Sequence, residues 1–173
     1  MGLKVVNVSR PMTDTSMFEA AGIEFSQTPV DSTTSRVDYI DILRDVDGAM
    51  IGTLPLTDRE VLESCPNLKV VSRSGVGVDS IDLPAATELG ILACNTPGIN
   101  TSEVADHAMA LLLSLTRHVR EADGAVKAGK WGDDPASIAA FRPNLRRIAG
   151  STIGIIGLGN IGRAFASPIR GFG

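Results

Sequence analysis

A glycine-rich stretch near the carboxyl end of the sequence has the spacing of a phosphate-binding loop. Gly157, Gly159 and Gly162 form a G-x-G-x-x-G pattern. The apolar run Ser151–Ile156 before it is typical of a buried β-strand, and Arg163–Ile169 after it has helical spacing. The pattern alone is weak evidence, but between a strand and a helix it predicts a dinucleotide-binding loop.

The residues of this loop have distinct physical tasks. Gly157 permits the tight turn, Gly159 leaves room for a pyrophosphate, and Gly162 lets the helix pack close to the strand. Free amides around Asn160 and Ile161 face that anion, with the positive end of the helix dipole behind them. These five residues are therefore predicted to bind NAD or NADP.

The sequence does not extend to the residue that would distinguish NAD from NADP. An acidic residue that holds the adenine ribose is expected about 20 residues after the glycines, and the sequence ends at Gly173. A nucleotide-binding sheet also needs several strands to bury its first one. We therefore interpret the chain as a fragment of a longer protein, which contains only the first strand, loop and helix of that fold.

Apolar runs alternate with helix-like stretches over the first hundred residues. This alternation is typical of strand–helix units on a parallel sheet. It predicts an α/β domain of the flavodoxin-like kind. Strands are expected at Leu3–Val8, Ile23–Phe25, Gly48–Ile51, Leu68–Ser72 and Ile91–Cys94.

Helices are expected between these strands. Thr57 and Glu60 form a capping box, with Thr57 as the N-cap of a helix that ends before Pro66. The remaining three are expected from Thr13 to about Ala21, across Tyr39–Leu43, and from Asp82 to Gly90.

The longest helical pattern is Thr101–Arg120. Its wide apolar stripe needs cover from a second domain or a second subunit. The polar stretch Gly129–Gly150 is interpreted as a connector over a surface. This stretch contains a basic cluster of Arg142, Arg146 and Arg147. The cluster is either a solvated face or a phosphate site, and the solvated face is favoured because no glycine-rich cradle is present there.

Composition excludes several classes of protein. The 16 Lys and Arg residues stand against 20 Asp and Glu, and one Trp, one Tyr and five Phe offer no base-stacking platform, so no nucleic-acid partner is expected. No apolar run approaches the roughly 18 residues of a membrane helix, and the start at Met1–Asn7 is expected to be a strand and not a signal peptide. Cys65 and Cys94 lack the spacing of a metal site. We expect a soluble, cytoplasmic protein without a metal.

The order and separation of several motifs match a known family from about residue 45 to the end of the chain. The chain resembles the D-isomer-specific 2-hydroxyacid dehydrogenases, in particular the phosphoglycerate dehydrogenase-like members. The first forty residues carry no signature. The motifs are Arg73–Asp82, Gly90-Ile91, Asn95–Gly98, Val104–His107, Gly129–Trp131 and the approach from Gly150 to Gly162.

The resemblance implies two domains and a reaction. Residues 1–100 would form the substrate domain, and residues 101–173 would begin an NAD(P)-binding Rossmann domain. Family enzymes move hydride between the nicotinamide and C2 of a small 2-hydroxy or 2-oxo acid. In relatives the helix that matches Thr101–Arg120 also helps form a homodimer.

The resemblance also assigns residues around the substrate. The amides of Val76 and Gly77 would bind the substrate carboxylate. This role suits a glycine-rich turn, because consecutive amides in such a turn can form an anion-binding nest. Alternatively, Gly75 and Gly77 serve only to turn the chain. Val76 and Val104 match positions that line the cofactor. Arg73 matches an arginine near the substrate, or it pairs with Asp79 or another surface carboxylate.

Two positions depart from the pattern, and the catalytic set is missing. Gly52 stands where phosphoglycerate-type members carry an arginine, which argues against a phosphorylated substrate, and Asp106 stands where Glu is usual. The family's catalytic arginine, glutamate and histidine lie downstream of the glycine loop. His107 and His118 do not match that histidine, so no catalytic residue is assigned.

Two other hypotheses remain at this stage. A nucleotide-sensing interaction protein similar to the C-terminal binding protein corepressors would share the fold. A natural truncation could instead serve as a dimerisation module through Thr101–Arg120. The ordered motifs favour the dehydrogenase hypothesis, and nothing positive in the sequence supports the corepressor-like one.

Overall fold

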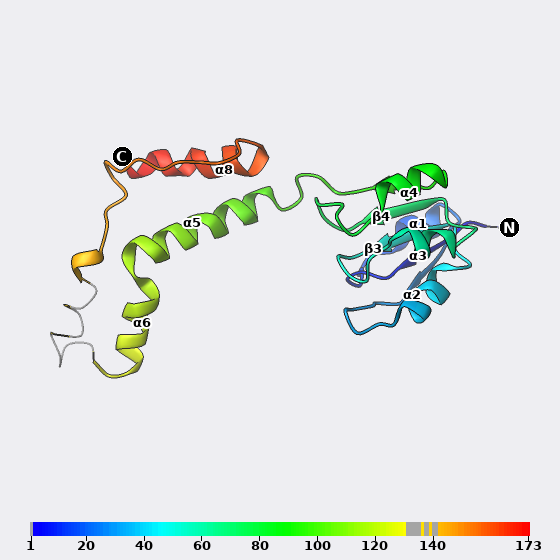
Figure 1. Ribbon diagram of the computed structural model, residues 1–173, viewed down its shortest axis with the longest axis horizontal. Coiled ribbons are helices and arrows are strands. Elements are labelled where there is room, and N and C mark those ends of the chain that lie inside the picture. The colour runs from blue at the N-terminus through cyan, green and yellow to red at the C-terminus, as the bar shows by residue number, and fades with distance from the viewer. Residues whose placement is uncertain (1, 131–135, 137–138, 140–141) are drawn as a thin grey trace. The chain divides into compact units, whose positions relative to one another are not determined.

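The computed structural model describes residues 2–130, 136, 139 and 142–173, and the chain divides into two compact units, Met1–Ile99 and Asn100–Gly173 (Figure 1). Each unit is described by itself. The predicted connector and the motif ending in Trp131 lie partly outside the described residues.

The first unit is built on a five-stranded, fully parallel sheet. The strand order is β2-β1-β3-β4-β5. Neighbouring strands pair apolar residues in register, so that Val6 aligns with Ala49, and Ala49 with Val71. This sheet confirms the predicted α/β, flavodoxin-like fold. The strands are β1 (Lys4–Asn7), β2 (Glu24–Gln27), β3 (Gly48–Ile51), β4 (Val70–Arg73) and β5 (Leu92–Cys94).

Four helices connect the strands, and three of them bury residues in the core. The core lies between the sheet and α2, α3 and α4, which contribute residues such as Leu43, Leu62 and Ala85. α1 buries none, and its Phe18 stacks on Phe25 of β2 with ring centroids 4.0 Å apart. The helices are α1 (Ser16–Ala20), α2 (Arg36–Leu43), α3 (Arg59–Glu63) and α4 (Leu83–Glu88).

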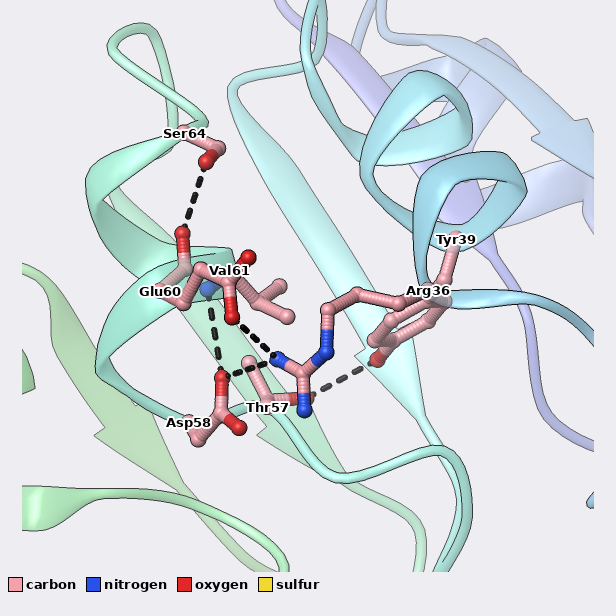
Figure 2. Close-up of polar contacts among 7 residues, drawn as sticks. All are labelled: Arg36, Tyr39, Thr57, Asp58, Glu60, Val61 and Ser64. Atoms are coloured by element: carbon pink, nitrogen blue, oxygen red, sulfur yellow. Dashed lines mark hydrogen bonds and ion pairs between the residues drawn. The ribbon is translucent and has the colours of Figure 1, made fainter.

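The predicted capping box of α3 is wrong by one residue. Asp58 is the N-cap, and its side chain accepts a hydrogen bond from the amide of Val61 at 3.3 Å. Thr57 is instead fully buried, with its hydroxyl 2.8 Å from that of Tyr39 (Figure 2). Because the core holds the Thr57 side chain, the next polar residue along the chain caps the helix.

Removing one partner of the buried Tyr39–Thr57 pair is expected to destabilise the protein. Tyr39→Phe leaves the Thr57 hydroxyl without its partner in the core, at a cost of about 1–3 kcal/mol. Replacing both partners, with Tyr39→Phe and Thr57→Val, is expected to cost less than the sum of the single changes. Urea unfolding of the four proteins measures this difference, and additive costs would contradict the proposed coupling.

Asp58 also forms an ion pair that should make stability depend on pH. Arg36 Nη1 lies 2.8 Å from Asp58 Oδ1 and 3.3 Å from a carboxylate oxygen of Glu60 (Figure 2). The hydrogen bond from Arg36 holds the pKa of Asp58 below its ordinary value. A depressed carboxylate pKa adds stability above the unfolded-state pKa, and this stability is lost as the pH falls through the lower, folded-state value.

Asp58→Asn keeps a good N-cap residue and removes the charge. The variant is expected to be less stable than the parent at pH 7, and the difference should shrink as the pH falls below the unfolded-state pKa of about 4 towards the lower, folded-state pKa of Asp58. Urea unfolding at pH 7 and at pH 3 measures both. An undiminished difference at pH 3 would show that the charge has no part in it.

The second unit contains a helix pair where one long helix was expected. The prediction of a continuous helix over 101–120 is wrong, because His118 adopts a left-handed conformation with φ of 52° and separates α5 (Thr101–Arg117) from α6 (Val119–Lys127). An L-residue in this conformation ends the helical hydrogen-bond ladder. A later segment of the chain lies against the end of α5, because the amide of Arg146 donates a hydrogen bond to the carbonyl of Thr116 at 2.9 Å.

α5 packs against α8 (Asn160–Ile169), and Figure 1 shows the two helices side by side. Ala105 on α5 is buried. Leu111 and Leu115, on the same helix, remain 59% and 75% exposed. Much of the predicted apolar stripe is therefore uncovered in the described structure. Short 3-10 helices, η1 (Arg142–Asn144) and η2 (Arg170–Phe172), complete the unit.

The expected buried strand before the glycine loop is absent. Residues 151–156 form no strand, and Ile156 is fully exposed. A strand requires a hydrogen-bonded neighbour, and no described segment pairs with this one. The apolar composition alone therefore gave a wrong prediction of local structure. No helix among the described residues combines the length and hydropathy needed to cross a membrane.

Candidate functional site

The segments that follow β3, β4 and β5 carry the polar groups of the first unit's candidate site. These three strands are parallel and adjacent in the sheet, so their carboxyl ends share one edge. Thr53 follows β3, Gly75–Gly77 follow β4, and Asn95 and Thr96 follow β5.

The turn at Gly75–Gly77 is fixed through its carbonyl groups. The carbonyl oxygen of Gly75 accepts a hydrogen bond from the amide of Thr96 at 2.9 Å. The carbonyl oxygen of Val76 accepts one from the side-chain amide of Asn95 at 2.7 Å. The segment after β5 therefore fixes both peptide planes of the turn.

This anchoring leaves two consecutive amides of the turn free. Across a trans peptide the carbonyl and the following amide point in opposite directions. The amides of Val76 and Gly77 are therefore directed away from Asn95 and Thr96, and neither donates a hydrogen bond to any described residue. Successive free amides of this kind can bind an anion. The geometry supports the predicted carboxylate site, which stays a prediction.

Arg73, at the end of β4, folds back over this turn. Its Nη2 donates to the hydroxyl of Thr53 at 2.9 Å. A methyl group on Gly75, whose φ is +150°, would overlap Nη1 of Arg73, so the guanidinium occupies the space that a side chain would fill. Arg73 forms no ion pair with Asp79 or with any other carboxylate of the described residues. Arg73 thus has no ion-pair partner among the described residues, although a carboxylate oxygen of Asp79 lies 3.1 Å from where a Cβ of Gly77 would stand.

Buried groups hold the loops after β3 and β4 together. The amide of Thr57 donates to the carbonyl of Ser80 at 2.8 Å, and the amide of Asp82 donates to the carbonyl of Thr57 at 3.1 Å. The Ser80 hydroxyl, in a residue only 5% exposed, donates to the carbonyl of Gly52 at 3.3 Å. The loop that carries Thr53 is therefore tied to the loop that carries the free amides.

The glycine loop of the second unit has the features that the sequence predicts for it. Gly157 has a φ of +91°, and a methyl group on Gly162 would overlap the carbonyl oxygen of Gly157. Gly159 is the N-cap of α8 and faces open space, since no atom lies within 4 Å of a Cβ built there. No side chain caps the helix, so the amides of Asn160 and Ile161 in its first turn are not satisfied by a capping group.

Arg163 braces this loop from the second turn of α8. Its Nη2 donates to Oδ1 of Asn160 at 2.7 Å, and its Nη1 donates to the carbonyl of Leu158 at 3.2 Å. The loop thus has a fixed shape and a positive charge beside it, both of which favour a bound anion. Val104 lies on α5, which packs against α8, and is 38% exposed.

Comparison with known proteins identifies the family. The sequence profile described as "D-isomer specific 2-hydroxyacid dehydrogenase, catalytic domain" matches residues 5–164. The chain belongs to the D-isomer-specific 2-hydroxyacid dehydrogenase family. The family is one of oxidoreductases that act on CH–OH donors.

Individual relatives agree with this assignment. The chain is 39% identical over 136 residues to the glyoxylate reductase of Thermococcus litoralis, covering 76% of this chain and 40% of the relative. It is 39% identical over 129 residues to the D-3-phosphoglycerate dehydrogenase of Mycobacterium leprae, covering 75% and 23%. The chain thus spans less than half the length of these relatives.

Solved structures show the same fold. The TT0316 protein of Thermus thermophilus is 27% identical with a TM-score of 0.82, over 98% of this chain and 53% of that one. The NAD-dependent formate dehydrogenase of Staphylococcus aureus, solved in complex with NAD, is 28% identical with a TM-score of 0.79, over the same two shares. The chain covers about half of each structure.

The predicted site residues of this dehydrogenase-family chain lie in two groups, one in each unit. Arg73, Val76 and Gly77 lie together in the first unit. Val104 and the glycine loop belong to the second unit. Their roles as substrate-binding and cofactor-binding residues stay predictions.

Two contributors to the site were missed by sequence reasoning. Asn95 was part of a quoted motif but received no role, and Thr53 received none. The signal for Asn95 is its place directly after strand β5, at the carboxyl edge of the sheet. Nothing local marks Thr53, because its partner Arg73 is twenty residues away.

The departures from the family pattern have defined places in the structure. Gly52 directly follows β3 and is partly buried, with the Cβ of Ser9 3.8 Å from where a Cβ would stand. Asp106 and His107 lie exposed on α5. The described residues contain no group of three or more potential metal-binding side chains.

Proposed function

We propose that this chain is the N-terminal part of an NAD(P)-dependent oxidoreductase that moves hydride between the nicotinamide and a small 2-hydroxy or 2-oxo acid. One observation carries the proposal: the free amides of Val76 and Gly77 directly follow Gly75, against which the guanidinium of Arg73 lies without an ion pair to any described residue. This combination suits a carboxylate. Family membership supports it, and so do relatives named for glyoxylate and formate, both small carboxylates.

On the substrate side, the main chain would hold the carboxylate and the side chain would add charge. The amides of Val76 and Gly77 would each donate to a carboxylate oxygen. Arg73 would supply a charge-assisted hydrogen bond, which is stronger than one between neutral groups. A carboxylate held at both oxygens fixes the orientation of the adjacent C2, the carbon that exchanges hydride.

On the cofactor side, the glycine loop fits a dinucleotide. Gly157, Gly159, Asn160, Ile161 and Gly162 would hold the pyrophosphate, because Gly159 leaves open space and the first turn of the helix has no capping side chain. Val76 and Val104 would contact the rest of the cofactor. When bound, the nicotinamide supplies or accepts the hydride.

The catalytic residues of the reaction are proposed to lie outside these 173 residues. In the family that this chain belongs to, an arginine, a glutamate and a histidine downstream of the glycine loop polarise the substrate and exchange its proton. The chain alone is therefore expected to bind ligands without turnover. Gly52 also favours a substrate without phosphate, because a phosphate would lack one charge-assisted partner worth about 1.5–3 kcal/mol.

An activity assay of the intact protein tests this function. NADH or NADPH oxidation is followed with glyoxylate, hydroxypyruvate, pyruvate and 3-phosphohydroxypyruvate as substrates. We expect turnover with at least one unphosphorylated acid and weaker activity with the phosphorylated one. The 173-residue chain serves as the control and should be inactive. Absence of turnover with all four acids would contradict the proposed function.

We also propose that α5 forms a homodimer interface. Leu111 and Leu115 leave a strongly exposed apolar surface on a helix that otherwise packs on α8. Light scattering of the intact protein is expected to give the mass of a dimer, and Leu115→Lys should shift it towards a monomer. Val37→Lys, at an exposed apolar residue of α2, is the matched control and should leave the dimer intact. A parent protein that is monomeric at micromolar concentration would contradict the proposal.

A further inference from the structure

Two neighbours hold the guanidinium of Arg73, and one of them, Thr53, has no role in the function proposed above. On one side it fills the space above Gly75 that a side chain would occupy. On the other side its Nη2 donates to the hydroxyl of Thr53 at 2.9 Å. Among the described residues, Thr53 is the one side chain that accepts a hydrogen bond from this guanidinium.

Without Thr53 the arginine would have many alternative positions. Arg73 is only partly buried, and no carboxylate of the described residues forms an ion pair with it. A long side chain of this kind loses rotamer entropy whenever it is fixed. A bond to a fixed acceptor lowers that cost before a ligand arrives.

The acceptor itself is well fixed. Thr53 follows Gly52, whose carbonyl accepts a hydrogen bond from the buried Ser80 hydroxyl. Ser80 belongs to the same loop as the free amides of the turn. The branched Cβ of threonine further restricts its side-chain rotation. The hydrogen bonds that join the two loops, at Gly52 with Ser80 and at Thr57 with Ser80, thus hold the Thr53 backbone near the turn.

We propose that Thr53 is a positioning residue for substrate binding. It holds the Arg73 guanidinium over the Gly75–Gly77 turn, so that its charge and the amides of Val76 and Gly77 act on one carboxylate. This inference rests on the proposed function, since it specifies how the same anion site selects its ligand. The ligand class is a small mono- or dicarboxylate.

The first test is a set of substitutions in the intact protein. Thr53→Val keeps the shape and removes the acceptor, and Thr53→Ser restores a hydroxyl. We expect Thr53→Val to raise KM for the 2-oxo acid about fivefold, with KM for the nicotinamide cofactor unchanged. Thr53→Ser should recover most of the loss. Thr87→Val, on the exposed face of α4, is the control and should leave both constants unchanged.

The second test asks whether Thr53 acts through Arg73. Binding of oxalate, a stable dicarboxylate, is measured by calorimetry for Thr53→Val, Arg73→Met and the double variant. We expect each single change to weaken binding, and the double variant to bind no more weakly than Arg73→Met alone. Multiplying effects would overturn the inference, as would unchanged oxalate affinity in Thr53→Val.

Failure of the two proposals can be told apart. If the parent protein binds oxalate but reduces no 2-oxo acid, the proposed function fails while the coupling between Thr53 and Arg73 is still decided by the binding cycle. If the parent protein is active and Thr53→Val matches it in KM, the positioning role fails and the function stands. Thr53 is exposed, so its replacement leaves the core intact.

Discussion

Gly159→Ala is expected to weaken dinucleotide binding at least about 100-fold while leaving the free protein folded. No atom lies within 4 Å of a Cβ built on Gly159, so the methyl group costs nothing before the ligand arrives. It would occupy the space through which the pyrophosphate approaches the first turn of α8. Fluorescence titration of the intact protein with NADH and NADPH measures the affinity, and thermal unfolding measures the stability.

Gly162→Ala is the informative comparison, because its methyl group would overlap the carbonyl oxygen of Gly157 even without ligand. This variant should therefore lose stability as well as affinity. Gly124→Ala, at an open position inside α6, is the control: it should leave the cofactor affinity unchanged and raise the stability by about 0.5–1 kcal/mol, because alanine favours a helix more than glycine does. Normal cofactor affinity in Gly159→Ala would show that the loop does not hold the pyrophosphate.

Gly75→Ala is expected to raise KM for the 2-oxo acid about 50-fold, with the cofactor affinity nearly unchanged. The added methyl group would overlap Nη1 of Arg73, so the guanidinium must leave its place beside Thr53. The φ of +150° at Gly75 is also unfavourable for any residue with a Cβ. Steady-state kinetics with the intact protein measures both Michaelis constants.

Gly90→Ala separates backbone strain from displacement of the arginine. Gly90 has a φ of +70° and no atom within 4 Å of an added Cβ. Its substitution should cost about 1–2 kcal/mol of folding stability and leave KM unchanged. If Gly75→Ala lowered stability in the same way without affecting KM, the turn would have no part in substrate binding.

The sheet of the first unit could be predicted from sequence because its signals are local. Strands buried on both faces are continuous apolar runs, and Gly48–Ile51 agrees with the structure at both ends. Asp82 with proline in the first turn, and a glycine after the last turn, gave the limits of α4. These features depend on a few neighbouring residues only.

The errors occur where distant residues decide the local structure. Thr57 matches the capping pattern, but Tyr39 binds its hydroxyl in the core. The helical pattern continues through His118, but the chain turns there. Residues 151–156 have strand composition and no strand beside them. In each case the sequence window was consistent with the prediction; for Thr57 and for residues 151–156 a tertiary partner, or the lack of one among the described residues, decided otherwise.

The candidate site divides in the same way. The glycine loop could be proposed from local sequence, because its six residues stand directly before a helical pattern, but the strand expected in front of it is absent. The substrate side required the family resemblance to locate Val76 and Gly77, and the structure to show why their amides are free. The bonds that matter there join Asn95 to Val76 and Thr53 to Arg73, about twenty residues apart in each case.

The groups that would face an anion in the Gly75–Gly77 turn are main-chain amides, and this affects how the proposed site can change over generations. Every amino acid except proline carries such an amide. A mutation at Val76 would therefore reshape the surroundings of the proposed carboxylate without deleting the amides that would bind it. The contributions proposed for Thr53 and Arg73, in contrast, come from side chains and are lost when either residue is replaced. If the proposed site is right, descendants of this gene are expected to keep a preference for acids while the identity of the acid changes.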